Sequence, residues 1–445
     1  MDINKISTPQ NFKGIYETTA YVQNHTLINR GITTIGGSTI PQCIMSNNKY
    51  EARERALMGG IYFVASYLTP IILIPLYNKH FLKNKGIIKD LNSLGKRIIQ
   101  VPKKYLTPKA DLNKGLKETA KHFDYEETQK SFNEIYSRYD DPSKLKKDLL
   151  SVHEKILMTD FITTGAMWSL IPWIATEFTE HRTKRTDFSA GFNLKNDMQK
   201  SSKELKQSKK EKIFWNVIFS TVPGVLFAKT VTKALNRGVK SIAKNANILE
   251  KFKNKVLNKI ASNPHNFDYT SGTNMSKTIY AAIWVLSSFP AKIISSRDSN
   301  ERRDRALRDI GLFTMFFGGD FLINNIAGRT ADKLFGTQIM NTEKFKDKNL
   351  NFFEKFKLNL KNFKDDSAFE NMNPKIVRRT KKIGAGLYWF SLLTNTALIG
   401  FGLPKVLNKI LRFNINREND KTSNKNRPLY YAKASMKDFV NNKSF

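Results

Sequence analysis

The clearest candidate for a functional residue is Asp320. It lies in the otherwise uncharged apolar stretch Gly311–Asn325 (GLFTMFFGGDFLINN). A carboxylate inside a membrane-spanning helix costs roughly 2.5–3.5 kcal/mol to insert, so it is expected to face other helices or a water-filled path. Asn324 follows one helical turn later on the same face, and Asn325 is its neighbour. The three residues form a candidate intramembrane polar site for an ion, a proton or a substrate.

The same stretch has a second interpretation, in which Asp320 begins a helix. It follows Gly318 and Gly319, and an aspartate after flexible glycines is a common helix-start pattern. Asp320 would then cap a helix that starts at Phe321 and would have no role on a transport path. The sequence favours this second interpretation slightly and leaves both open.

Basic residues in a repeated motif form the second candidate site. The segment Glu51–Leu57 (EARERAL) recurs as Glu301–Leu307 (ERRDRAL) at an offset of 250, with five of seven positions identical. Acids and arginines at this spacing can pair along a helical turn or bind phosphate. A solvated, salt-bridged helix start is at least as good an interpretation, because exposed charge runs usually have that origin. The arginines that could bind lipid headgroups are Arg53, Arg55, Arg302, Arg303 and Arg305.

The recurrence extends beyond the motif and predicts an internal duplication. Upstream, Pro41–Ser46 (PQCIMS) aligns with Pro290–Ser295 (PAKIIS) when one residue is gapped. Downstream, each copy enters an apolar stretch that contains glycine and phenylalanine, near Gly60 and Gly311. A duplicated unit determines much of an architecture. With an even number of crossings between the copies, the halves would be parallel repeats.

Catalytic motifs are absent from the sequence. It contains no P-loop, no dinucleotide-binding glycine pattern, no H-E-x-x-H, no G-x-S-x-G and no C-x-x-C. The six histidines are scattered, and the single cysteine, Cys43, is best interpreted as a small apolar residue. We therefore expect no enzymatic activity, no cofactor and no metal site.

The elements that must position these residues are apolar blocks. Ala56–Asn78 and Ile383–Pro404 contain 23 and 22 residues without a charge, and about 20 apolar residues suffice to cross a bilayer. Flanking lysines and arginines can extend shorter blocks, because their long side chains reach toward the headgroups. The shorter blocks are Phe161–Thr176, Ile213–Ala228, Thr278–Ala291 and Ile310–Gly328.

The predicted fold is all-α: a polytopic helical membrane protein with about six apolar helices, an internal duplication, and basic amphipathic helices in the loops. A soluble helical protein with these blocks in its core is the alternative. The expected regions are an N-terminal segment (1–50), a first repeat half (51–160) with apolar helix 56–78, a region of two short apolar helices (161–277, with helices 161–176 and 213–228), a second repeat half (278–413, with helices 278–296, 310–328 and 383–404), and a basic polar tail (414–445).

The charge balance predicts anionic partners. Lysine and arginine number 74 against 39 aspartates and glutamates, a net charge of +35. Lys344–Asp365 and Ile248–Ile260 place apolar residues at helical spacing among lysines, which is typical of helices that lie on an anionic membrane, although packing against other helices fits equally well. The short loop Lys292–Asp309 carries six basic residues, which places the termini in the cytoplasm.

Three functions compete on this sequence. The first is a non-enzymatic integral membrane protein, structural or scaffolding, whose basic loops contact anionic lipid. The second is a small-solute or ion transporter or channel, built from two parallel repeats with Asp320 on the pathway. The third is a soluble basic helical protein that binds nucleic acid, since the isoelectric point is near 9.9. No nucleic-acid-binding motif accompanies the charge, so nucleic acid is not an expected partner.

Overall fold

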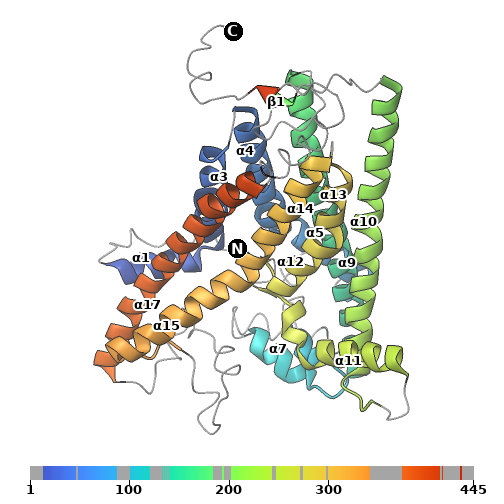
Figure 1. The fold of residues 1–445 in the computed structure, drawn as a ribbon. Helices are drawn as coiled ribbons and strands as arrows, with labels where there is room; N and C mark the ends of the chain where they lie inside the picture. The colour runs from blue at the N-terminus through green and yellow to red at the C-terminus, as the bar shows by residue number, and fades with distance from the viewer. Residues whose placement is uncertain are drawn as a thin grey trace. The chain divides into compact units, whose positions relative to one another are not determined.

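The computed structural model describes residues 14–46, 49–87, 101–120, 141–183, 193–194, 202–242, 247–270, 274–296, 299–340, 373–410 and 431–432, with single residues at 133, 135, 137, 139 and 413. These residues are almost entirely helical (Figure 1), which confirms the all-α prediction. Two short antiparallel pairs join β1 (Asn193–Leu194) to β4 (Tyr431–Ala432) and β2 (Tyr269–Thr270) to β3 (Asn274–Met275). The predicted amphipathic helix at Lys344–Asp365 lies outside the described residues.

The chain divides into two compact units. The first contains residues 1–63, 187–197 and 298–445, and the second contains 64–186 and 198–297. Each unit therefore draws on segments that are far apart in the sequence.

The first unit is built around α17 (Pro374–Asn395), which packs on α1 (Ile15–Asn24) and on α15 (Asp320–Phe335). The hydroxyl of Tyr388 donates a hydrogen bond to Asn29 over 2.7 Å, and the indole of Trp389 donates one to Thr19 over 2.9 Å. The other helical segments are α2 (Thr26–Gly31), η2 (Ile32–Thr39), α3 (Ile40–Ile44), α4 (Lys49–Phe63), α14 (Ser299–Thr314), η7 (Met315–Gly319) and η10 (Thr396–Gly402).

The second unit is built around α9 (Pro142–Thr183), a helix of 42 residues that packs on α10 (Ser202–Arg237) and α5 (Thr69–Asn84). Its core side chains Phe161 and Trp168 are almost fully buried. The other segments are η3 (Val64–Leu68), η4 (Lys103–Leu106), α7 (Leu112–Ala120), α11 (Ile248–Ser262), η5 (Pro264–Phe267), α12 (Lys277–Ile283), η6 (Trp284–Ser288) and α13 (Phe289–Ile294).

Prolines explain most of the π-helical segments in the described part of the chain. The segments η2, η3, η6 and η10 each end two residues before a proline. Proline lacks an N–H group, and its ring clashes with the carbonyl four residues earlier. A π-helical turn moves that carbonyl to a different donor, so the helix continues through the proline. The prolines concerned are Pro41, Pro70, Pro290 and Pro404.

Four helices are long and apolar enough to cross a membrane: Lys49–Asn84, Lys209–Arg237, Arg302–Phe335 and Pro374–Ile410. They contain the predicted blocks 56–78, 213–228, 310–328 and 383–404. The prediction of about six such helices is therefore met in four cases among the described residues.

The two remaining blocks lie in α9 and in α12–α13 of the second unit. Phe161, Trp168 and Ile171 in the first block, and Ile279 and Ile283 in the second, are at most 1% exposed. Other helices of the same unit cover these side chains, which is an alternative reason for a short apolar run. Other residues of the same blocks remain exposed, among them Ile174 at 46% and Val285 at 47%.

Candidate functional site

A cluster of buried polar side chains lies in the second unit, where α9 meets residues 101–106 and 264–270. His153 and Asp160 are seven residues apart in α9 and therefore share a helical face. Lys103 comes from η4, and Asp268 and Tyr269 directly follow η5. Asp160 is 1% exposed, Lys103 2% and His153 4%, so each polar group must find its partner inside the protein.

The carboxylate of Asp160 accepts two hydrogen bonds. The hydroxyl of Tyr269 donates to Oδ2 over 2.9 Å, and that of Thr164 donates to Oδ1 over 3.3 Å. Burial raises the pKa of Asp160 to about 6, although both hydrogen bonds act to lower it. Burial and the neighbouring Asp160 raise the pKa of Tyr269 well above its ordinary value. Asp160 can therefore gain or lose a proton near neutral pH, while Tyr269 stays protonated.

Lys103 is a buried cation that holds two loops together. Its ammonium donates to the carbonyl of Phe267 over 2.6 Å and to Oδ1 of Asp268 over 3.4 Å, and its backbone N–H donates to the same carboxylate oxygen over 3.1 Å. The Nζ atom also lies 5.7 Å from the centre of the Tyr269 ring. Burial lowers the pKa of Lys103, and Asp268 opposes this shift. The pair fixes η4 against the residues that follow η5.

His153 is the least satisfied member of the cluster. Neither of its ring nitrogens has a hydrogen-bond partner among the described residues. Burial, followed by the charge of Lys103, lowers the pKa of His153 well below its ordinary value, so the ring is neutral at pH 7. The arrangement can hold a proton on Asp160, and the hydrogen bond from Tyr269 fastens the segment after η5 to α9.

Sequence reasoning missed this cluster because its members come from three separate segments. Lys103 and Asp268 are 165 positions apart, so no local motif connects them. One signal was present: His153 and Asp160 lie at helical spacing on the apolar face of VHEKILMTDF. Polar residues on such a face indicate a buried polar contact.

The two copies of the repeated motif contact each other in the first unit. Arg55 on α4 lies 3.3 Å from Glu51 and 3.3 Å from Asp304 on α14. Asp304 also receives two hydrogen bonds from Arg308, of 2.9 and 3.4 Å. Asp304 is 1% exposed, Glu51 5% and Arg308 6%. The interpretation of the motif as a solvated helix start is therefore wrong for these residues, because the charges pair inside the unit.

The arginines proposed as headgroup ligands have different environments. Arg55 is occupied by two carboxylates. Arg302 and Arg303 are exposed, while Arg53 and Arg305 are partly buried. The exposed pair is therefore the part of this candidate site that an external phosphate can reach.

Asp320 lies within a continuous helix and not at a helix start. It is the first residue of α15, directly after η7, and Gly319 before it has right-handed helical angles, φ −64° and ψ −48°. The helix runs without a break from Arg302 to Phe335. The interpretation of Asp320 as the cap of a helix that begins at Phe321 is therefore wrong. Asn325 is 2% exposed, whereas Asn324 is only partly buried.

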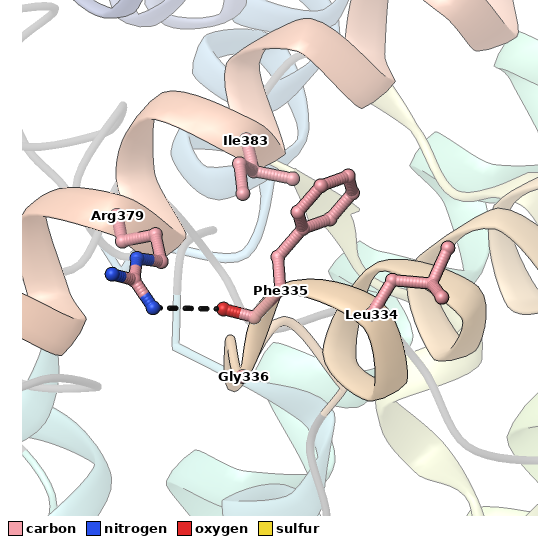
Figure 2. Close-up of a pocket in the computed structure, with 5 residues that line it drawn as sticks. All are labelled: Leu334, Phe335, Gly336, Arg379 and Ile383. Atoms are coloured by element: carbon pink, nitrogen blue, oxygen red, sulfur yellow. Dashed lines mark hydrogen bonds between the residues drawn. The ribbon is translucent and has the colours of Figure 1, made fainter.

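A depression of about 540 Å³ lies at the C-terminal end of α15, beside α17 (Figure 2). Gly336 ends α15 with a left-handed φ of 58°, a conformation that suits glycine. Arg379 donates a hydrogen bond to the carbonyl of Phe335 over 3.1 Å. Its guanidinium thus satisfies a carbonyl that the helix end leaves free. Leu334 and Ile383 complete the lining.

Among the described residues, no group of three or more histidine, cysteine, aspartate or glutamate side chains is arranged to hold a metal ion. No protein family, curated protein or solved structure matches this chain. The case for its function therefore depends on its own geometry.

Proposed function

We propose that this chain is a non-enzymatic integral membrane protein of structural or scaffolding type, which associates with anionic lipid through its basic loops. The observation that carries the proposal is the exposed apolar surface of the four candidate spans. Leu76 is 55% exposed, Leu226 60%, Ile326 58% and Leu393 67%. At most 28% of the most apolar window of each helix is buried inside the protein. Water-soluble monomers rarely expose contiguous apolar surface on this scale.

Close helix packing through small residues supports the same proposal. A Cβ atom on Gly165 of α9 would lie 2.5 Å from the hydroxyl of Ser287 on η6, and one on Gly400 of η10 would lie 2.5 Å from Pro41 on α3. Lipid tails are as apolar as leucine, so helices in membranes gain their contact from close approach at small residues. Both units contain such a contact.

The test is membrane extraction followed by a lipid preference assay. The protein should stay in the pellet after alkaline carbonate treatment. A larger fraction of the protein should be recovered with vesicles that contain phosphatidylglycerol than with vesicles of phosphatidylcholine alone. The reason is that each basic residue near an anionic surface contributes about 1 kcal/mol to the binding free energy. A chain that is monodisperse in buffer without detergent would refute the membrane assignment. Equal recovery in both vesicle types would refute the lipid preference.

A transporter or channel is the second candidate, and the uninterrupted helix at Asp320 favours it. An aspartate within a continuous candidate span has a large insertion cost, and such residues usually serve an ion or substrate path. Proteoliposomes would test this function: Asp320→Asn should abolish a proton or cation flux that the wild-type protein shows. Absence of any flux in the wild type would remove this candidate and leave the structural role.

We also propose that the repeated motif marks an internal duplication. Two helices end in the same way at an offset of 250. The N–H of Met45 donates to the carbonyl of Pro41, and the N–H of Ser295 donates to the carbonyl of Ala291, each over 2.9 Å. Each is followed by a helix that contains one copy of the motif and then a π-helical segment. The residue gapped in the sequence alignment corresponds to the extra residue of α13, which has six residues where α3 has five.

The proposed topology retains six crossings, in which residues 161–176 of α9 and 278–296 of α12–α13 supply the two further spans, and both termini lie in the cytoplasm. Cysteine labelling would test it: an impermeant maleimide should label cysteines placed at both ends of the chain only after the cytoplasmic face is opened. Labelling of one end from outside would require an odd number of crossings.

A further inference from the structure

The helix α11 is held across the C-terminal end of α10 by polar side chains of one face (Figure 1). Asn254 accepts a hydrogen bond of 2.7 Å from Arg237, in the last turn of α10. Asn258 accepts one of 3.1 Å from the N–H of Lys240 and donates one of 2.6 Å to the carbonyl of the same residue. The chain turns between the helices at Gly238, whose φ is 67°. These contacts fix the rotation of α11 about its own axis.

The opposite face of α11 is apolar and exposed. Ile248 is 88% exposed, Leu249 79%, Phe252 68% and Val256 38%. At 100° per residue these four positions form one stripe, centred about half a turn from Asn254 and Asn258. Because the asparagines bind the unit, the stripe faces away from it. We call these four residues the α11 stripe.

Lysines flank the α11 stripe on both sides. Lys251, Lys255 and Lys259 follow one edge at a spacing of four residues, and Lys253 lies on the other edge. All four are exposed. An exposed apolar stripe flanked by lysines is the arrangement of helices that lie in the plane of an anionic membrane surface.

We propose that α11 lies on the anionic headgroup layer of the same bilayer that α10 crosses, with the α11 stripe inserted between the acyl chains. The inference rests on the proposed membrane function and names the lipid-binding element within it. Its geometry follows from α10: a helix fixed across the end of a membrane span lies at the level of the headgroups. The occupant is lipid, because the span and the stripe are parts of one continuous structure and the flanking charge is positive.

Spin labels on full-length protein in vesicles would test the proposal. Cys43 is the single cysteine, so Cys43→Ser provides a background in which Phe252→Cys marks the stripe and Lys251→Cys marks its edge. In vesicles with phosphatidylglycerol, the label at position 252 should be reached by oxygen and shielded from a water-soluble nickel complex. The label at position 251 should show the reverse.

The lysine contribution is tested with the label at position 252. Lys255→Gln should lower the ratio of inserted to free label about fivefold, which corresponds to about 1 kcal/mol for one lysine at an anionic surface. Lys114→Gln, an exposed lysine of α7, is the matched control and should leave the ratio unchanged. Equal losses in both variants would mean that general charge, and not α11, recruits the lipid.

The outcomes separate this inference from the proposed function. If position 252 is as accessible to nickel as position 251 while the protein resists carbonate extraction, the α11 inference fails and the membrane assignment stands. If position 252 is shielded equally with and without phosphatidylglycerol, and labels on different copies broaden each other, a second chain covers the stripe and the inference is also wrong. Loss of the protein into the carbonate supernatant would refute the proposed function itself.

Discussion

Replacing Asp160 by asparagine should stabilise the folded protein at neutral pH. The carboxylate is 1% exposed and its pKa is raised from 3.8 to about 6 by burial. A carboxyl group with a raised pKa favours the folded state when it is protonated, so its cost appears as pH rises. The cost begins near the unfolded value of 3.8 and is complete above 6. Asparagine stays neutral at every pH and does not have this cost.

The magnitude follows from the shift. A difference of 6 − 3.8 in pKa corresponds to about 3 kcal/mol in the free energy of unfolding above pH 6. At pH 4.5 the same relation gives a destabilisation by Asp160 of about 1 kcal/mol. The advantage of Asp160→Asn over the wild type should therefore grow by about 2 kcal/mol between pH 4.5 and 7.5. The amide can still accept from Tyr269 and donate to Thr164, so both hydrogen-bonding positions remain occupied.

The assay is denaturant unfolding in detergent micelles at several pH values, analysed as the difference between variant and wild type. His153 has a lowered pKa and destabilises the fold as pH falls below 6.5, but this effect is the same in both proteins and cancels. Asp141→Asn is the control, since Asp141 is exposed and the N–H of Ser143 holds its pKa below the ordinary value. That variant should lose stability relative to wild type as pH rises. A difference for Asp160→Asn that does not change with pH would refute the reasoning.

Three further predictions concern packing and pairing. Arg55→Leu should lower the unfolding free energy by about 3–5 kcal/mol, because it removes a cation that pairs with two buried carboxylates. The exposed Arg302→Leu should change it by less than about 0.5 kcal/mol, and equal effects would contradict the buried pair. Gly165→Ala should cost about 1–3 kcal/mol through the clash with a serine of η6, and Gly60→Ala, which meets nothing within 4 Å, should be neutral or stabilising in the same melts. Tyr388→Phe should cost about 0.5–1.5 kcal/mol for the lost bond to α2, and an unchanged melting temperature would show that water replaces that bond.

The helices themselves were predictable from the sequence, because the signal is local. Blocks such as 56–78 and 383–404 contain enough uncharged residues to fix both helix and length. The sequence does not state what covers a helix. The block at 161–176 is as long and as free of charge as that at 213–228. Neighbouring helices nevertheless cover Phe161 and Trp168 of α9, while α10 exposes Val217 and Leu226.

The charged clusters were predictable only in part, because their contacts are long-range. The sequence contains the repeated motif and predicts ion pairs along one helix. The pairing of Arg55 with Asp304 joins positions 249 residues apart, and the Lys103 cluster depends on a loop more than 160 residues away. Neither separation leaves a periodic trace in the sequence, since only the folded chain brings the segments together.

Helical phase explains which charges next to an apolar block turn inward. Asp304 and Arg308 are four residues apart, share the face of α14 that meets α4, and are buried, whereas Arg302, two residues before Asp304, lies about half a turn away and is exposed. A buried charge must be paired to be tolerated, and Asp304 and Arg308 meet this requirement through their spacing of four on one face. An unmatched arginine on the opposite face is free to meet solvent or phosphate. Helical phase separates the two kinds of charge, but the contact between Asp304 and Arg55 decides which face is buried.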